Sequence, residues 1–216
     1  MKRKASFLLG LVLATIGFAL SLAAQGLKPV KLPPPQTDVG RPLMQALKDR
    51  KSTREFGSAT LSPQTLSNLL WAAFGINRPD GHRTAPSAMN WQEVTIYVVA
   101  PEGVYVYDAR DNTLKPVLAG DHRAATGTQS FVKDAPVNLV YVSDLSKTGR
   151  AASSDAEMFT AADVGFIAQN VYLYCASEGL ATVVRGSIDK PALAKTLNLQ
   201  PSQKIILAQS VGYPKK

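Results

Sequence analysis

The sequence predicts an α+β fold in which helices cover a mixed, largely antiparallel β-sheet. Two segments with strand character, 94–99 and 104–107, are joined by a short turn, which predicts a hairpin. A further segment, 137–142, is apolar almost throughout, as in central strands that are covered on both faces. Residues 154–179 give the strongest helical pattern and end at a glycine. Strands and helices mixed in this way favour the α+β class.

Two helices are expected before the hairpin. Residues 42–49 place three apolar side chains on one face, at the spacing of an amphipathic helix. A second helix begins at Ser62, a favourable N-cap that is followed by proline, and ends at Gly75. Three short elements follow the long helix: a strand at 180–184, a helix that starts at Asp189, and a strand at 204–211.

Residues 1–24 have the three-part pattern of a secretory signal peptide. A start with three cations precedes an apolar run over 5–20, and Ala23 and Ala24 offer a cleavage site. The alternative is an uncleaved anchor helix, because the apolar run approaches the length that spans a membrane. With cleavage, we expect an exported protein, periplasmic or extracellular, that keeps no stable membrane span.

Residues 25–41 are expected to form a proline-rich linker. Pro33, Pro34 and Pro35 favour an extended polyproline II conformation and donate no backbone hydrogen bonds. The linker would either separate the leader from the fold or wrap over its surface. Residues 42–216 then form one domain, since this length is typical of a single domain.

Composition argues against several function classes. The formal net charge is +8, and residues 1–24 hold three cations and no acid, so the remainder carries three charges fewer, +5. The basic residues are scattered and not interleaved with aromatics, so we expect no nucleic-acid partner. His82 and His122 lack the spacing of zinc ligands, so we expect no metal site. The sole cysteine, Cys175, precludes an internal disulfide and is expected to be a small buried residue.

A basic cluster closes the first predicted helix; its members are Arg50, Lys51, Ser52, Thr53 and Arg54. Three cations and two hydroxyls supply the kinds of donor that bind a phosphate group. Alternatively, the cations complement the negative end of the helix dipole and bind no ligand. Neither a Gly-x-Ser-x-Gly elbow nor a Walker-type loop is present, and no catalytic side chain can be singled out. This scarcity of acid–base groups fits chemistry that a cofactor carries.

Six segments stand in a characteristic order along about residues 42–214. They are the basic signature at 50–56, the helix at 69–76, the loop at 83–88, the helical stretch 165–170, the pair 179–180, and Val-Gly-Tyr-Pro at 211–214. In this order they resemble the nitroreductase-like flavoenzymes, an FMN-dependent family, and in particular its azoline-peptide-oxidase branch. The resemblance implies an α+β domain that holds FMN noncovalently, often across the interface of a homodimer.

The resemblance also implies which residues meet the flavin. Arg50, Lys51, Ser52 and Arg54 would contact its phosphate, ribityl chain and pyrimidine edge. A second cofactor-binding segment would comprise Pro86, Ser87, Ala88 and Asn90. Gly186 and Ser187 would lie near the reactive flavin N5, where a backbone N–H can stabilise negative charge on the reduced ring. Ordinary turn roles are the alternative for Asn90, Gly186 and Ser187.

Two departures from the family pattern bear on function. Many relatives carry further basic residues after Gly-Tyr-Pro that reach the FMN phosphate, whereas here the sequence stops at Lys215 and Lys216. We expect these lysines to form a frayed, solvated tail; the alternative is that they take the place of the relatives' basic residues. The Lys-Tyr pair of the azoline oxidases is not identifiable. Arg185, next to Gly186, is expected to be solvated rather than to grip a phosphate or a substrate.

The function implied is that of an exported FMN-dependent oxidoreductase. NAD(P)H or another donor, such as a partner in the cell envelope, would pass hydride to flavin N5. The electrons would then reach a small-molecule acceptor: a nitroaromatic, a quinone or a similar flat compound. Two alternatives are a noncatalytic flavin- or small-molecule-binding protein on the same fold, and an interaction scaffold without a cofactor. A homodimer is the expected assembly.

Overall fold

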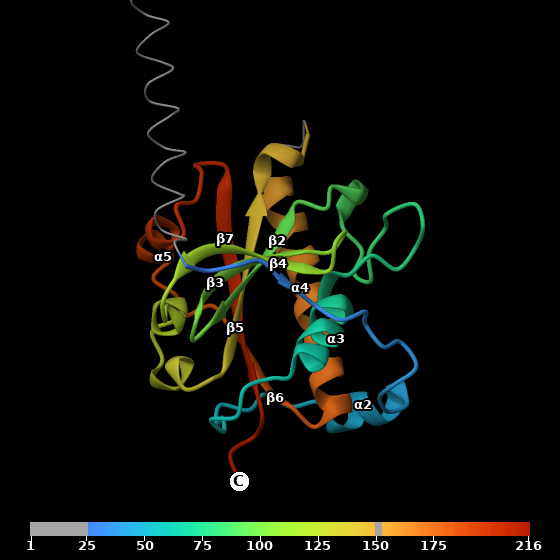
Figure 1. Cartoon of the computed structure of the whole chain (residues 1–216). Helices are drawn as coiled ribbons and strands as arrows, with labels where there is room; N and C mark the ends of the chain where they lie inside the picture. Colours follow the sequence, from blue (N-terminus) through green and yellow to red (C-terminus); the bar gives the residue numbers. More distant parts are fainter. Residues whose placement is uncertain (1–25, 150–152) are drawn as a thin grey trace, which may run out of the picture.

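The computed structural model describes residues 26–149 and 153–216 and contains a single β-sheet with helices on both faces (Figure 1). Its seven strands lie in the order β1-β4-β3-β2-β5-β7-β6, and every neighbouring pair is antiparallel. This confirms the predicted α+β fold with a largely antiparallel sheet. The expected signal peptide, 1–24, lies outside the described residues.

Most elements begin and end within a few residues of the predicted positions. The strands are β1 (Val30–Lys31), β2 (Val94–Ala100), β3 (Gly103–Asp108), β4 (Thr113–Ala119), β5 (Val137–Asp144), β6 (Ala181–Arg185) and β7 (Gln203–Gly212). The helices are α2 (Leu43–Asp49), α3 (Pro63–Phe74), α4 (Ser153–Glu178) and α5 (Lys190–Thr196). Short 3-10 turns are η1 (Ala88–Asn90), η2 (Arg123–Thr126), η3 (Ser130–Lys133) and η4 (Leu145–Lys147). Of these strands and helices, β1 and β4 were not predicted.

The strand β5 lies at the centre of two apolar layers. Leu139 and Tyr141 pack with residues of α3 and α4 on one face of the sheet. Val140 and Val142 pack with Leu193 of α5 and its neighbours on the other face. The unbroken apolar run therefore reflects burial on both sides, as predicted.

The strands β4 and β1 were missed because their sequences carry weak strand signals. β4 contains Pro116, which cannot donate a hydrogen bond to a ladder, and Lys115, which is exposed. A register shift between Val104 and Tyr105 of β3 lies beside Pro116 and accommodates the proline. β1 is two residues long and forms only because it adds to the free edge of β4.

The proline-rich segment follows the surface of the domain. Its Leu32 is 3% exposed and belongs to the main core. The carbonyl oxygen of Pro33 accepts hydrogen bonds from Ser67 of α3, at 2.5 Å, and from Asn112 beside β4, at 2.7 Å. This segment, residues 26–41, is called the N-terminal strap below.

Candidate functional site

The basic cluster runs beside β6 after the chain leaves α2. The backbone N–H of Thr53 donates to the carbonyl oxygen of Thr182 at 2.9 Å. Tyr172 of α4 supports the same segment: its hydroxyl lies 2.8 Å from that of Ser52 and accepts the backbone N–H of Val184 at 2.9 Å. The guanidinium of Arg50 lies 5.4 Å from the centre of the Tyr172 ring. Tyr172 therefore joins α4, the cluster and β6.

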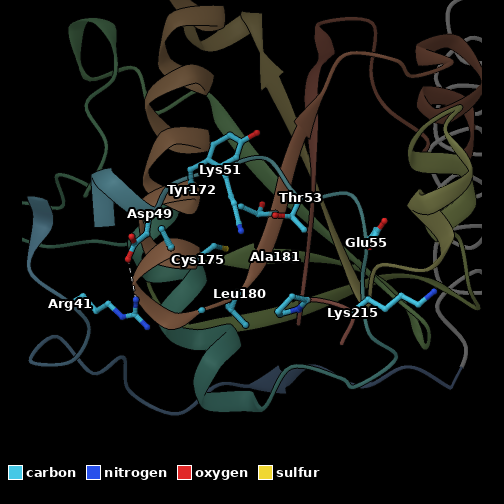
Figure 2. Close-up of a pocket in the computed structure, with 14 residues that line it drawn as sticks. Arg41, Asp49, Lys51, Thr53, Glu55, Tyr172, Cys175, Leu180, Ala181 and Lys215 are labelled. Atoms are coloured by element: carbon cyan, nitrogen blue, oxygen red, sulfur yellow. Dashed lines mark hydrogen bonds and ion pairs between the residues drawn. The ribbon is translucent and has the colours of Figure 1, made fainter. Parts of the chain in front are cut away.

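Side chains of the basic cluster do not form one cradle. Arg50 and Ser52 contact Tyr172, whereas Lys51 and Thr53 line a cavity of about 610 Å³ (Figure 2). Arg54 lines a different hollow. In the single chain, Lys51 and Arg54 therefore do not line one common phosphate site.

Residues of both charges line the rim of this cavity, and apolar residues line its base. Figure 2 shows Arg41 and Asp49 on one side, Glu55 and Lys215 on the opposite side, and Lys51 between them. Arg41 and Asp49 form an ion pair at 3.1 Å. A hydrogen bond from Gln45, followed by one from Arg41, lowers the pKa of Asp49.

Cys175 lies at the base of this cavity and is fully buried. Burial strongly raises the pKa of its thiol, so the thiolate is not populated near neutral pH. This agrees with the expected role as a small buried residue.

The C-terminal tail is docked against residues 55–57, directly after the basic cluster, which was not expected from the sequence. Gly57 donates its N–H to the carbonyl oxygen of Tyr213 at 2.9 Å, and Phe56 pairs with Pro214. Lys215 lines both the cavity beside Lys51 and the hollow beside Arg54. The expectation of a frayed tail is wrong for Lys215, because the backbone around Phe56 fixes its place.

The second predicted segment forms a strained loop around η1. The backbone N–H of Ala88 donates to the Asp163 carboxylate of α4 at 2.8 Å. The Gln92 side chain donates to the amide oxygen of Asn90 at 2.9 Å, and the Gln92 backbone N–H donates to the Ser87 hydroxyl at 3.0 Å. Pro86 and Asn90 are exposed. Gln92 thus holds both the Ser87 hydroxyl and the Asn90 amide oxygen, and Asn90 itself is exposed.

The first and second segments contact different parts of α4. Tyr172 holds the basic cluster and Asp163 holds the η1 loop, nine residues earlier. At the rise of an α-helix this is about 13 Å along the axis. No residue of 86–90 lines the cavity beside Lys51. One chain therefore presents two separate groups of predicted cofactor contacts.

Gly186 and Ser187 lie on the same side as the basic cluster. They are exposed and follow β6, whose Val184 is bonded to Tyr172. The Ser187 carbonyl oxygen accepts the N–H of Thr128 at 3.0 Å. Tyr172 thus links Ser52 of the first predicted group to Val184, two residues before Gly186 of the third.

Arg185 is buried, so the expectation of a solvated side chain is wrong. It is 4% exposed and donates to the carbonyl oxygen of Thr126, to Asn138 and to Ser210. All of these partners are neutral, and burial lowers its pKa to about 10. It remains a cation at neutral pH and ties the η2 segment to the sheet. Its environment comes from three distant segments, which no local pattern reveals.

These positions can now be compared with known proteins. The Nitroreductase family matches residues 47–213, a range that contains all three predicted groups. The chain belongs to the nitroreductase family. A candidate nitroreductase of Methanocaldococcus jannaschii is 31% identical over 168 residues, which are 73% of this chain and 85% of that protein.

Solved structures agree with this membership of the nitroreductase family. A candidate nitroreductase from Ralstonia eutropha is 41% identical, with a TM-score of 0.85 over 89% of this chain and 92% of that chain. A candidate nitroreductase from Desulfovibrio desulfuricans, solved in complex with FMN, is 22% identical, with a TM-score of 0.60 over 82% of this chain and 88% of that one. The second likeness shows the shared fold alone.

In this nitroreductase-family chain, one face of α4 is uncovered and apolar. Met158 is 58% exposed, Phe159 41% and Phe166 48%. Gly165 lies in the middle of the same face, and a Cβ built there would meet nothing within 4 Å. Glycine in a helix interior lowers stability by about 1 kcal/mol relative to alanine. Packing within the chain gives no reason for Gly165.

Within residues 26–149 and 153–216, no group of acidic, histidine and cysteine side chains is arranged to hold a metal ion. In the same part of the chain, none of the helices combines the length and the apolar character that a membrane span needs.

Proposed function

We propose that this nitroreductase-family chain is an FMN-dependent oxidoreductase whose flavin site is completed by a second copy of the chain. One observation carries the proposal: the basic cluster and the η1 loop contact α4 at Tyr172 and Asp163, and the same helix leaves Met158, Phe159 and Phe166 exposed. A homodimer would cover this face and bring groups from two copies together. The FMN in the Desulfovibrio desulfuricans relative supports the choice of cofactor.

The available side chains fit the phosphate of FMN. Arg54 and Lys215 line one hollow together with Arg123 and Lys133. Guanidinium and ammonium groups at such a site bind a phosphate through charge-assisted hydrogen bonds. Glu55 and Asp134 line the same hollow, and Arg123 is paired with Asp121 at 2.7 Å, so Arg54, Lys133 and Lys215 are the cations that would meet an incoming anion.

The backbone near Gly186 fits the flat ring of FMN. A Cβ built on Gly186 would meet only the Leu207 side chain, at 3.8 Å, so the outer side of this backbone is open to close approach. When bound, FMN would supply the redox chemistry, taking up hydride and passing on electrons. The chain would supply position, a backbone N–H near the ring, and cations for the phosphate.

The position of Gly165 defines how two copies would pair. Tyr172 lies seven residues after Gly165 and Phe159 lies six residues before it. Antiparallel packing of two α4 helices about Gly165 would therefore place the Tyr172 end of one copy beside the Phe159 end of the other. Phe159 packs edge-on against Trp91, with ring centres 6.2 Å apart. The basic cluster of one copy would then face the η1 loop of the other.

For the electron donor we propose NAD(P)H or a component of the cell envelope, and for the acceptor a nitroaromatic, a quinone or another flat small molecule. The placement in the azoline-peptide-oxidase branch is also proposed, on the signatures at 50–56 and 83–88. Export to the periplasm or beyond is proposed from residues 1–24. Fractionation of cells that express the full chain, with the mass of the mature N-terminus, tests export; a full-length chain in the cytoplasm contradicts it.

The absorbance spectrum of the purified protein tests the cofactor. We expect a yellow protein with FMN that is released on denaturation, and a dimer by light scattering. Anaerobic mixing with NADPH should bleach the flavin absorbance, and a nitroaromatic or quinone should restore it. FMN that binds but is not reduced by any donor would indicate the noncatalytic binding protein. Failure to bind added FMN would contradict both the oxidoreductase and the noncatalytic flavin-binding protein.

Two variants test the site itself. Replacing Arg50 and Arg54 together by alanine should weaken FMN binding by at least about tenfold, since each charge-assisted bond contributes about 1.5–3 kcal/mol. Lys195→Ala, an exposed cation on α5, is the matched control and should leave binding unchanged. Phe166→Glu should yield monomers without FMN. A Phe166→Glu monomer that binds FMN as tightly as the wild type would show that one chain suffices.

A further inference from the structure

Two carboxyl groups are buried together under the η1 loop. Glu93, the last residue before β2, is 0% exposed, and Asp163 of α4 is 3% exposed. Asp163 accepts the backbone N–H of Ala88 at 2.8 Å. In the described part of the chain, neither carboxyl oxygen of Glu93 has a hydrogen-bond partner at standard geometry. A buried, unpaired carboxylate is strongly unfavourable, so this pair needs a proton or a cation.

The groups around Glu93 offer no cation. α4 contributes the Asp163 carboxyl and the Thr160 hydroxyl, and Thr160 in turn accepts from Ser143 of β5 at 3.3 Å. Asp144, at the end of β5, donates its backbone N–H to the Glu93 carbonyl oxygen, but its own carboxylate is bonded by Ser146. Asp163 is therefore the ionisable group that faces Glu93 among the described residues.

Burial and mutual repulsion place the proton within the pair. Burial, and then the charge of Asp163, raise the pKa of Glu93. Burial also raises the pKa of Asp163, but the Ala88 N–H and a bond from Glu93 lower it in part. Asp163 therefore carries the negative charge more readily, and Glu93, the weaker acid of the two, keeps the proton. One O–H of Glu93 directed at Asp163 would satisfy both groups.

We propose that Glu93 and Asp163 share one proton and that this pair positions the η1 loop for cofactor binding. One oxygen of Asp163 accepts the Ala88 N–H, and the other would accept the Glu93 O–H. These two hydrogen bonds would tie β2, the loop and α4 together. The loop needs such support, because Met89, Asn90 and Gln92 have positive φ of 49°, 56° and 48°. Backbone in this region is strained and persists only where neighbouring contacts fix it. The cofactor role rests on the proposed function; the shared proton does not.

The pair makes the loop sensitive to rising pH. Because the pKa of Glu93 is raised in the folded chain, its stabilising contribution is complete in acid and is lost as the pH rises through the folded pKa. Above that pKa, two carboxylates repel each other under the loop. Glu93→Gln keeps a donor for Asp163 but cannot ionise, so its loop should hold at alkaline pH.

Unfolding of the FMN-free protein by urea, from mildly acidic to mildly alkaline pH, tests the shared proton. Wild type should lose stability toward alkaline pH, and Glu93→Gln should show a flatter profile. Glu178→Gln is the matched control, because it removes an exposed carboxyl group from α4, the helix that carries Asp163. It should keep the wild-type profile. Equal pH profiles for wild type and Glu93→Gln would overturn the proposal.

Infrared spectroscopy keeps the proposal testable if Glu93→Gln does not fold. Wild type at neutral pH should show the carbonyl stretch of a buried protonated carboxylic acid. Asp163→Asn should shift this band, because the Glu93 O–H loses the carboxylate that accepts its hydrogen bond. Absence of the band from wild type would overturn the proposal.

FMN titration separates the loop from the flavin. As the pH rises, the loss of FMN affinity in wild type should exceed that in Glu93→Gln by at least about tenfold. The rate of amide hydrogen exchange at Ala88 should rise over the same pH range in wild type. If the stability and infrared results hold but no variant binds FMN, the proposed function fails and the shared proton stands. If FMN binds with the same pH dependence in both proteins, the positioning role fails while the oxidoreductase proposal stands.

Discussion

Tyr172 connects more of the candidate site than any residue of the basic cluster itself. Its hydroxyl meets Ser52 and the Val184 N–H, and its ring lies under Arg50. Buried tyrosines place an apolar ring in the core and bring a polar tip to a partner. The sequence predicted the long helix that carries Tyr172, and Tyr172 is buried there. It gave no sign of which segment the hydroxyl would meet, because Ser52 is 120 residues away.

Tyr172→Phe should therefore loosen the basic cluster without emptying the core. The Val184 N–H loses its acceptor, and the free energy of unfolding should fall by about 1 kcal/mol. Urea unfolding of Tyr172→Phe, Ser52→Ala and the double variant measures the coupling between the two hydroxyls. Strictly additive effects would show that this hydrogen bond contributes nothing.

Arg185 makes a second residue-scale prediction. It is a buried cation whose partners are all neutral, so its removal takes the side-chain donor from the Thr126 carbonyl oxygen and leaves Asn138 with Ser210 as its remaining donor. Arg185→Met should destabilise the protein by about 3 kcal/mol in urea unfolding. Arg78→Met, at an exposed loop position, is the control and should change stability by less than about 0.5 kcal/mol. A small effect at Arg185 would mean that water replaces the lost donors.

At the scale of elements, the sequence was most informative where one segment carries its own signal. Burial on both faces of the sheet gives β5 an unbroken apolar run, and this run predicts a strand. Burial of one helical face gives α4 apolar residues at helical spacing, and this spacing predicts a helix. β1 and β4 depend on pairing between distant segments. β1 is short and β4 contains a proline, so neither sequence predicts a strand. The candidate site divides in the same way. Its three segments were found in order, but which of Arg50, Lys51 and Arg54 share a hollow depends on packing.

Two glycines of α4 should respond in opposite directions to alanine. Gly179 ends the helix with φ of +70°, where alanine is strained, so Gly179→Ala should lower the free energy of unfolding by about 1 kcal/mol. Gly165 has open space and helical surroundings, so Gly165→Ala should stabilise the isolated chain by up to about 1 kcal/mol. If two α4 helices meet there, this gain should shrink as protein concentration rises. Thermal unfolding over a range of concentrations tests both, and a concentration-independent gain would exclude close helix packing at Gly165.

At the scale of the whole molecule, the N-terminal strap belongs to the domain rather than to a free linker. Composition alone suggested an extended segment, and prolines do keep it extended, but β1 pairs with β4 and Leu32 enters the core. The strap thus covers a sheet edge that would otherwise be free to pair with other chains. The sequence left separation and wrapping both open, since a single buried leucine in a polar stretch has no periodicity to reveal it.

Leu32→Ala should expose how much the strap contributes to the fold. Loss of a buried leucine side chain and the cavity it leaves should lower the free energy of unfolding by about 2–3 kcal/mol. Val30→Ala is the matched control on the same strand, since Val30 is 39% exposed, and its effect should stay below about 0.5 kcal/mol. Because release of the strap also uncovers the edge of β4, Leu32→Ala should aggregate more readily near its unfolding temperature, as measured by light scattering. Equal stabilities for the two variants would show that the strap lies on the domain without holding it together.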